Sequence, residues 1–157
     1  MSSEQLSKIS NTIKFLSADM IQSANSGHPG TPMGLSDVMS VFMSKVRHNP
    51  KNPAWLNRDR VVFSGGHASA LVYSYLYLSG YDLSMDDLKS FRRLHSKTPG
   101  HPEITTPGVE IATGPLGQGV ANAVGFAMAA KYAAYLLNEE GNEIIDHRVY
   151  CFCGDGD

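Results

Sequence analysis

The sequence predicts an α/β domain in which helices flank a parallel β-sheet. Stretches with apolar residues every three or four positions alternate with short runs of β-branched and aromatic residues. These short runs are continuously apolar, which is typical of parallel strands that are buried on both faces. Glycine-rich segments follow three of the runs, as loops do at the carboxyl ends of strands in open α/β sheets. A chain of 157 residues is long enough for one domain.

The N-terminal part predicts two helices. The first covers residues 4–25, and Ser2 with Gln5 forms a capping box at its start. Its apolar positions recur at helical spacing: Leu6, Ile9, Ile13, Leu16, Met20 and Ala24. Two glycines and a proline in residues 27–30 end this helix. The second helix covers residues 35–46, and a polar, proline-containing loop follows over residues 49–59.

The middle of the chain predicts a strand at residues 60–64, closed by Gly65 and Gly66. A helix then begins at His67, and Gly80 is its expected C-cap. A short helix follows over residues 84–94, with Ser84 and Asp87 as its cap. Residues 95–108 contain three prolines and form a long exposed loop, and loops of that length are usually functional or mobile.

The last third predicts a strand at residues 109–113, a glycine-rich turn at 114–119, a helix from 118 to 138, and a strand at 149–153. The helix is rich in alanine and glycine, so a neighbour can pack closely against it. The whole alternation predicts a parallel sheet with helices on both faces.

Composition and charge exclude several classes of protein. The net charge of −2 and the absence of a basic run exclude a nucleic-acid footprint. No apolar stretch approaches the roughly 18 residues of a membrane span, and the polar N-terminus does not resemble a signal peptide. Cys151 and Cys153 alternate on one strand with poor geometry for a bridge, so we expect two reduced core thiols. The chain therefore reads as cytoplasmic, with no membrane partner.

Candidate site residues fall on loops. Histidines lie in four-to-five-residue segments that also contain glycine: residues 26–30, 65–69 and 100–103. The turns at 65–69, 114–119 and 154–157 each follow a predicted strand, so one crevice is expected to collect them. The histidine spacing is not that of zinc ligands. Neutral histidines instead suit a polar, sugar-sized pocket, because each donates or accepts hydrogen bonds and moves protons near neutral pH.

Two glycine-rich turns predict contacts with an anion. Gly154-Asp155-Gly156 follows an apolar strand, and a carboxylate between two glycines is a way to hold Mg²⁺ or Ca²⁺ against a diphosphate. The turn at 114–119 lacks the spacing of the dinucleotide fingerprint, because Pro115 and Leu116 interrupt it. Free N–H groups at the start of the following helix are expected to meet an anion.

As a set, these motifs resemble one family, the transketolases, which are thiamine diphosphate enzymes. SGHPGTPMG, GGHAS, GHPE, GPLGQG and GDG stand in the family's order over essentially the whole chain. The resemblance implies that residues 1–157 are the N-terminal portion of the diphosphate-binding domain, a thiamine diphosphate-binding fold truncated at its C-terminus. Thr31 stands where the family commonly has alanine.

The resemblance also implies individual roles. Asp155 is the metal ligand, and Gly156 contacts the diphosphate by its backbone. Gly114 and Leu116 touch the cofactor, His67 approaches the diphosphate, and His28 and His101 bind sugar oxygens. The three histidines His28, His67 and His101 are then the catalytic residues of this portion. Further metal ligands and an activating glutamate are expected downstream.

The implied activity is transfer of a two-carbon ketol unit from a ketose phosphate to an aldose phosphate, in the pentose phosphate pathway. It uses thiamine diphosphate with Mg²⁺ or Ca²⁺ in a homodimer whose active sites form between subunits. Residues 1–157 alone are therefore expected to be inactive. Three alternatives stay open: dihydroxyacetone synthase or another thiamine diphosphate enzyme, a non-catalytic module that keeps the fold, and one half of a split enzyme.

Overall fold

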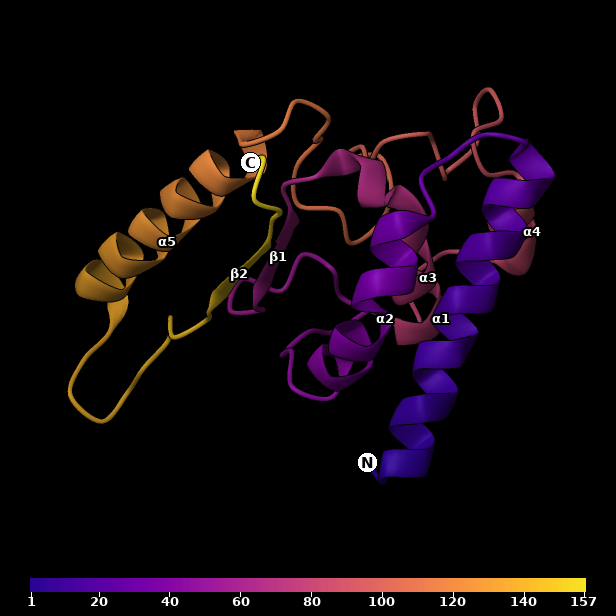
Figure 1. Cartoon of the computed structure of the whole chain (residues 1–157). Coiled ribbons are helices and arrows are strands. Elements are labelled where there is room, and N and C mark those ends of the chain that lie inside the picture. The colour runs from indigo at the N-terminus through magenta and orange to yellow at the C-terminus, as the bar shows by residue number, and fades with distance from the viewer.

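The computed structural model describes residues 1–157 and divides them into two regions (Figure 1). The helical region comprises α1 (Ser3–Ala24), α2 (Gly30–Met43), α3 (Ser69–Ser79) and α4 (Met85–Lys89). The α5 wing comprises α5 (Gln118–Leu137) and β2 (Val149–Phe152) with the loop between them. Strand β1 (Arg60–Phe63) pairs with β2 and joins the two regions, and a 3₁₀ turn, η1 (Gly66–Ala68), leads from β1 into α3.

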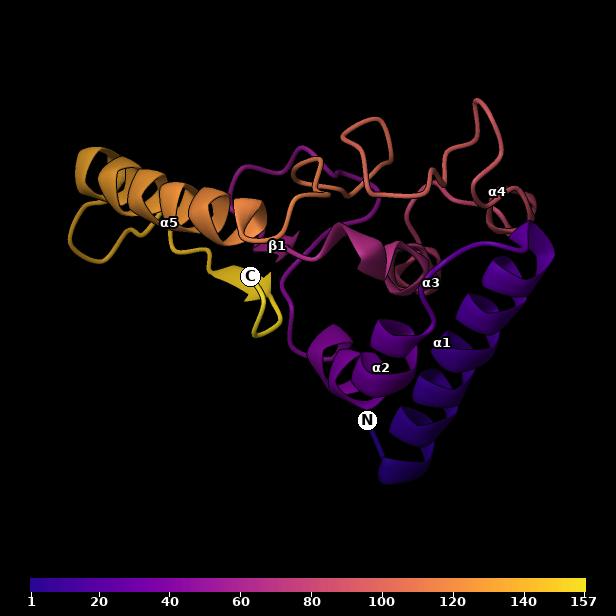
Figure 2. The ribbon, with the colours of Figure 1, turned by 45° about the horizontal axis from the view of Figure 1, so that its top comes forward.

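The sheet has two parallel strands and is covered on both faces, as predicted. Its register pairs Arg60 with Val149 at one end and Phe63 with Phe152 at the other. On one face, Phe42 of α2 meets the ring of Phe152 edge-on at 5.1 Å. On the other face lies α5, which Figure 2 shows on the opposite side of the strands from α2. The α/β class with a parallel sheet flanked by helices is thus confirmed.

The hydrophobic core lies in the helical region. Its main cluster contains fifteen buried residues, all between Ile13 and Phe91. Helix α3 crosses its centre, and residues 69–76 of this helix are all buried. Small polar residues let α1 approach α3 closely, because the Ser17 hydroxyl lies 3.1 Å from that of Ser74 and donates to the carbonyl of Ala70 at 3.3 Å. The buried face of α1 thus combines the predicted apolar residues Ile13 and Met20 with the small residues Ser10 and Ser17.

The predicted caps are confirmed. Ser2 and Gln5 form a capping box on α1, and Ser84 and Asp87 form one on α4. Gly80 ends α3 in the left-handed conformation with φ +86°. These caps satisfy N–H and C=O groups that a helix leaves unpaired at its ends.

The predicted start of the second helix was wrong. Helix α2 begins at Gly30 rather than near residue 35. Pro29 is its N-cap and Pro32 stands in its first turn, where the missing N–H of a proline would have had no partner in any case. Glycine and proline at residues 29–34 therefore start a helix here rather than prevent one.

One further helix boundary and one predicted strand differ from the structure. Helix α4 ends at Lys89 instead of continuing to residue 94, and Arg92 has the left-handed φ of +61°. Residues 109–113 do not form a strand. They run beside β1, where Glu110 lies 3.6 Å from Arg60, but the N–H of Thr113 donates to Pro102 rather than to a strand.

Two predictions about the α5 wing were also wrong. Cys151 and Cys153 are free thiols as expected, but Cys151 is only half-buried and Cys153 is exposed, so they are not core residues. We also expected no apolar stretch near the length of a membrane span, but helix α5 is long and apolar enough to cross a membrane, by length and composition alone. Only Gly119 and Ala123 of this helix are buried.

Candidate active site

Three histidines from three separate loops converge beside the sheet. The ring centroid of His28 lies 5.5 Å from that of His67 and 6.3 Å from that of His101. His28 precedes α2, His67 lies in η1, and His101 lies in the loop between α4 and α5. The sequence thus identified a real cluster, although its three residues are 34 to 73 positions apart along the chain.

The His101 loop is held by α3. The hydroxyl of Ser69 donates to the carbonyl of Gly100 at 2.8 Å, and the hydroxyl of Tyr73 donates to the carbonyl of Pro99 at 2.7 Å. Burial raises the pKa of Tyr73, so this hydroxyl stays protonated and remains a donor. The loop is not the uniformly exposed segment that we predicted, because Thr98 and Thr106 within it are fully buried.

His67 is placed by the close approach of two backbone segments. A Cβ atom on Gly66 would lie 2.2 Å from the carbonyl oxygen of Thr113, which leaves no room for a side chain. Glycine at this position therefore brings residues 113–114 against η1 and next to the histidine cluster. The glycine serves backbone packing first, and any approach to a ligand is a consequence of that packing.

A hollow of about 430 Å³ opens beside this cluster. Its walls come from the start of α2, the end of β1 with η1, and the end of β2. The residues around it include Gly30, Thr31, Gly65, His67, Gly154 and Asp157. The turns at 65–69 and 154–157 therefore meet at one crevice, as the sequence predicted.

Asp157 joins the third turn to this crevice. Its carboxylate accepts hydrogen bonds from the Ser64 hydroxyl at 2.5 Å, from the Gly117 N–H at 2.9 Å and from the Gly154 N–H at 2.7 Å. These hydrogen bonds hold the pKa of Asp157 below its ordinary value, and the bond from the Ser64 hydroxyl makes the largest contribution. The carboxylate ties the end of β1, the turn before α5 and the end of β2 together.

This arrangement takes up most of the N–H groups that were expected to be free at the start of α5. The N–H of Gly117 is taken by Asp157, that of Gln118 by the carbonyl of Pro115, and that of Val120 by the Ser64 hydroxyl. An anion already occupies the N-terminus of this helix, and it is a side chain of the protein.

The remaining predicted residues lie at the same end of the sheet. A Cβ atom on Gly156 would lie 3.6 Å from the side chain of Leu116, and one on Gly114 would lie 3.9 Å from the ring of His101. Leu116 is 53% exposed, which leaves an apolar side chain open to a ligand. Gly114, Leu116 and Gly156 thus border the histidine cluster and the 154–157 turn.

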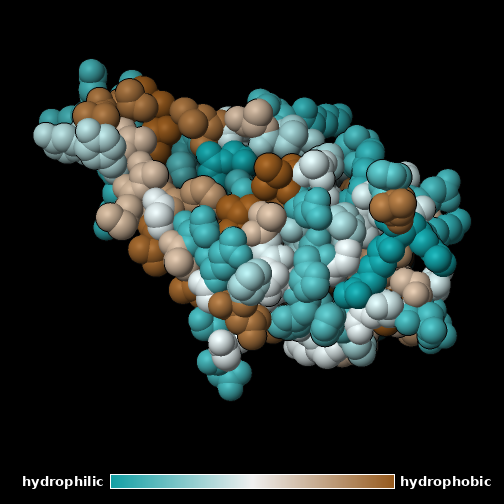
Figure 3. Space-filling view, turned by 90° about the horizontal axis from the view of Figure 1, so that it is seen from above, coloured by the Kyte–Doolittle hydropathy of each residue, from teal (hydrophilic) through white to brown (hydrophobic).

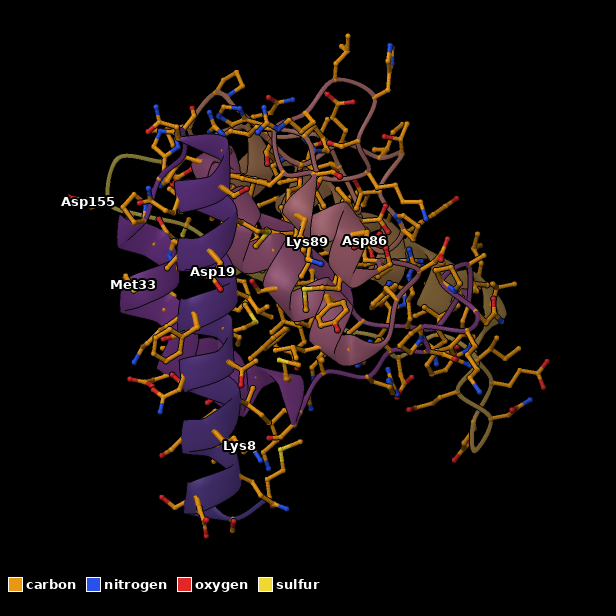
Figure 4. All side chains as sticks on the ribbon, turned by 90° about the vertical axis from the view of Figure 1, so that its right-hand side faces the viewer. Lys8, Asp19, Met33, Asp86, Lys89 and Asp155 are labelled. Carbon is orange, nitrogen blue, oxygen red and sulfur yellow. The ribbon has the colours of Figure 1, made fainter.

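Asp155 lies in the 154–157 turn, two residues from Asp157 and away from the acidic groups of α1 and α4. Figure 4 shows it on the C-terminal loop at the edge of the molecule, away from Asp19, Asp86 and the other labelled residues of α1 and α4. It is exposed, and no group of three or more histidine, cysteine, aspartate or glutamate residues forms a metal site. A hard carboxylate beside open glycines fits a divalent cation on a diphosphate, but this chain supplies a single ligand of that kind.

Electrostatics favours the neutral form of His28. Partial burial lowers its pKa, and the positive charge of Arg92 and the neighbouring His67 and His101 lower it further. A neutral imidazole carries one donor and one acceptor, as a site for hydroxyl and carbonyl oxygens needs.

Sequence reasoning missed Ser64, Arg92 and Asp157. Asp157 had a visible signal, because it is the second acidic residue of Gly154-Asp155-Gly156-Asp157. Ser64 and Arg92 had none, since Ser64 bonds to Asp157 from 93 positions away and Arg92 bonds to Ser26 from 66 positions away.

The fold and this site define the diphosphate-binding domain of a thiamine diphosphate enzyme. The family model described as the transketolase thiamine diphosphate-binding domain matches residues 5–157. The chain therefore belongs to the transketolase family.

Known transketolases are closely similar over this stretch. Transketolase 1 of Pasteurella multocida is 58% identical over 151 residues, which are 95% of this chain and 23% of that protein. The crystal structure of transketolase from Campylobacter jejuni is 70% identical, with a TM-score of 0.96, over 100% of this chain and 24% of that one. Transketolase from Pichia stipitis in complex with sedoheptulose 7-phosphate is 52% identical, with a TM-score of 0.95, over 99% and 23%. The chain thus spans about a quarter of the length of its relatives.

Proposed function

We propose that these residues form one part of a transketolase active site, which transfers a two-carbon ketol unit from a ketose phosphate to an aldose phosphate. The observation that carries this proposal is the convergence of His28, His67 and His101 beside the 154–157 turn. Similarity to a transketolase solved with sedoheptulose 7-phosphate supports sugar phosphates as the substrates. The relatives above are all transketolases, so the alternatives of another thiamine diphosphate enzyme, a non-catalytic module or a split enzyme gain no support.

His28 and His101 are proposed to bind the oxygens of the sugar. Both rings are exposed at the mouth of the cluster, so a ligand reaches them directly. A neutral imidazole there donates a hydrogen bond to a hydroxyl or carbonyl oxygen and exchanges a proton with it. Partial burial and the charge of Arg92 lower the pKa of His28, which favours the neutral form of that ring.

His67, Gly114, Leu116 and Gly156 are proposed to hold thiamine diphosphate, and Asp155 to bind the Mg²⁺ or Ca²⁺ on its diphosphate. The half-buried His67 lines the hollow together with Gly154 of the 154–157 turn. Leu116 offers an exposed apolar surface next to Gly156. When bound, the cofactor supplies the chemistry that breaks and forms the carbon–carbon bond. The protein contributes orientation, hydrogen bonds and control of protons.

We further propose that the whole enzyme acts in the cytoplasm, in the pentose phosphate pathway, as a homodimer. The described residues supply a single candidate metal ligand, whereas Mg²⁺ or Ca²⁺ takes six or more oxygen ligands. Further ligands then have to come from other residues.

The test is a ketol-transfer assay on the full-length protein with thiamine diphosphate and Mg²⁺. We expect His28→Ala and His101→Ala each to lower kcat/KM by about 10²-fold, as loss of a positioned acid–base group does. The control is His95→Asn, because His95 is exposed, lies outside the cluster, and has a φ of +61° that asparagine tolerates.

Residues 1–157 alone, assayed in parallel, are expected to give no turnover above the uncatalysed rate. Equal activity of the His28→Ala, His101→Ala and His95→Asn proteins would contradict the proposed site. Turnover by the 157-residue chain would contradict its dependence on further residues.

A further inference from the structure

Arg92 occupies an unusual position between two of the histidine loops. It follows α4, its backbone has a φ of +61°, and its N–H donates to the carbonyl of Thr98 at 2.9 Å. A left-handed conformation is costly for a residue with a long side chain, and such residues concentrate at functional sites. The strained backbone aims the side chain of Arg92 at the histidine cluster.

The guanidinium group of Arg92 connects the loop of His28 to the loop of His101. One terminal nitrogen donates to the hydroxyl of Ser26 at 3.0 Å. The other lies 3.4 Å from Nδ1 of His28 and 3.4 Å from the carbonyl oxygen of Gly100. Residues 26–28 and 100–101 belong to separate loops, so this one side chain sets their relative position.

The contact with His28 has a defined chemical direction. An arginine side chain has five N–H donors and no acceptor. The Nδ1 atom that faces it must therefore accept, and in a neutral ring the hydrogen then sits on Nε2. The ring is left with its N–H on the side away from Arg92, available for an oxygen of a ligand.

The surroundings of His28 also oppose its protonation. The charged and titratable groups that face it are Arg92, His67 and His101, and none of them is a carboxylate. Partial burial contributes most to the lowered pKa, and the Arg92 charge is the next contribution. The Arg92 contact thus sets the tautomer of this ring, and its charge adds to the effect of burial in favouring the neutral form.

We propose that Arg92 is a positioning residue that fixes His28 as a neutral imidazole with its hydrogen on Nε2, ready to donate to a substrate oxygen. Arg92 itself touches neither substrate nor cofactor in this proposal. The inference rests on the proposed function only in assigning the sugar oxygen to His28. The tautomer of His28 is a property of the protein alone and is measured without substrate.

The first measurement is the ¹⁵N NMR spectrum of histidine-labelled full-length protein, with His28 assigned by its loss in a His28→Gln variant. The proposal expects an acceptor-type Nδ1 and a protonated Nε2 in the native protein, and a mixture of tautomers in Arg92→Gln. A native His28 with the hydrogen on Nδ1, or an unchanged spectrum in Arg92→Gln, would overturn the proposal.

The second measurement is the pH profile of kcat/KM. Removing a positive charge raises the pKa of His28, so the acidic limb should move up by about half a unit in Arg92→Gln. Arg92→Lys keeps the charge but has no planar fork, so its acidic limb should stay in place while kcat/KM falls. An acidic limb that is identical in all three proteins would contradict the proposal.

The matched control is Arg93→Gln. Arg93 is the exposed neighbour of Arg92, and its side chain makes one long hydrogen bond, 3.5 Å, to the carbonyl of Ser23. It should change neither the spectrum nor the pH profile. Should Arg92→Gln fail to fold, the native spectrum and Arg92→Lys still decide the matter. Absent ketol transfer in the native protein with the expected tautomer present would count against the proposed function and leave this inference standing.

Discussion

The helical region and the α5 wing bury their apolar residues to very different extents. All fifteen residues of the main core cluster lie between Ile13 and Phe91, in the helical region or at the end of β1. Helix α5 buries only Gly119 and Ala123. Large apolar side chains follow one another along its exposed surface: Val124, Met128, Tyr132, Tyr135 and Leu136. Figure 3 shows hydrophobic (brown) surface at the α5 end of the molecule.

This difference separates the two halves of the proposed site. The loops of His28 and His101 are fixed by the helical region, through α3 and Arg92. Leu116 and the 154–157 turn border the wing, Leu116 before α5 and the turn after β2, and a few hydrogen bonds to Asp157 hold these turns together. An exposed apolar stripe of this size is typical of a surface that another segment or subunit covers. The proposed sugar-binding loops are thus fixed by the packed helical region, whereas the proposed cofactor-binding turns depend on a few hydrogen bonds beside an exposed apolar helix.

The largest expected contrast uses two leucines on helices. Leu71 in α3 is fully buried, and Leu136 in α5 is 59% exposed. Leu71→Ala should lower the free energy of unfolding by about 2–5 kcal/mol, because it leaves a cavity in a packed core. Leu136→Ala should change it by less than about 0.5 kcal/mol in the 157-residue chain. Urea unfolding measures both. A Leu136→Ala cost as large as that of Leu71→Ala would show that the stripe on α5 is packed after all.

A second contrast lies within α5. A Cβ atom on Gly119 would lie 2.4 Å from Cα of Ser64, whereas one on Gly125 would meet nothing within 4 Å. Gly119→Ala should therefore force α5 away from β1, at a cost of about 1–3 kcal/mol. Gly125→Ala should stabilise the helix by about 0.5–1 kcal/mol. Thermal melting of the two variants gives the sign of each effect. Destabilisation by Gly125→Ala would mean that its side of α5 is covered.

The smallest expected effect concerns the ion pair that joins the two regions. Asp146, just before β2, accepts from Arg47 at 2.9 Å and from Asn57 at 2.6 Å. Both hydrogen bonds lower the pKa of Asp146, and the bond from Arg47 makes the larger contribution. A carboxyl with a lowered folded-state pKa stabilises the protein above its unfolded pKa of about 4, and the effect is lost as the pH falls through the folded-state value.

Asp146→Asn should therefore be less stable than the native chain at pH 7, with a difference that shrinks as the pH falls below about 4. The difference should also shrink in high salt, because both side chains are partly exposed. Unfolding curves at several pH values measure it. A gap that stays constant from pH 7 to pH 2 would exclude the charge as its source.

Local patterns were sufficient for much of this molecule. Helical spacing predicted α1, α3 and α5, and short-range cap chemistry predicted the capping boxes at Ser2 and Ser84. The meeting of the turns at 65–69 and 154–157 at one crevice was also predicted, because parallel strands deliver their loops to one edge of a sheet. These features depend on residues a few positions apart, or on a rule of topology.

Only the tertiary structure decided the rest. The sequence of residues 109–113 suits a strand, but Thr113 gives its N–H to Pro102, and the segment stays irregular. The helix N-terminus of α5 suits an external anion, but Asp157 fills it from 40 positions away. Arg92 stands in no motif, yet it sets the direction of the hydrogen bond at His28 from 64 positions away. Sequence patterns report local preference, whereas the partner of each polar group is chosen by contacts between distant segments.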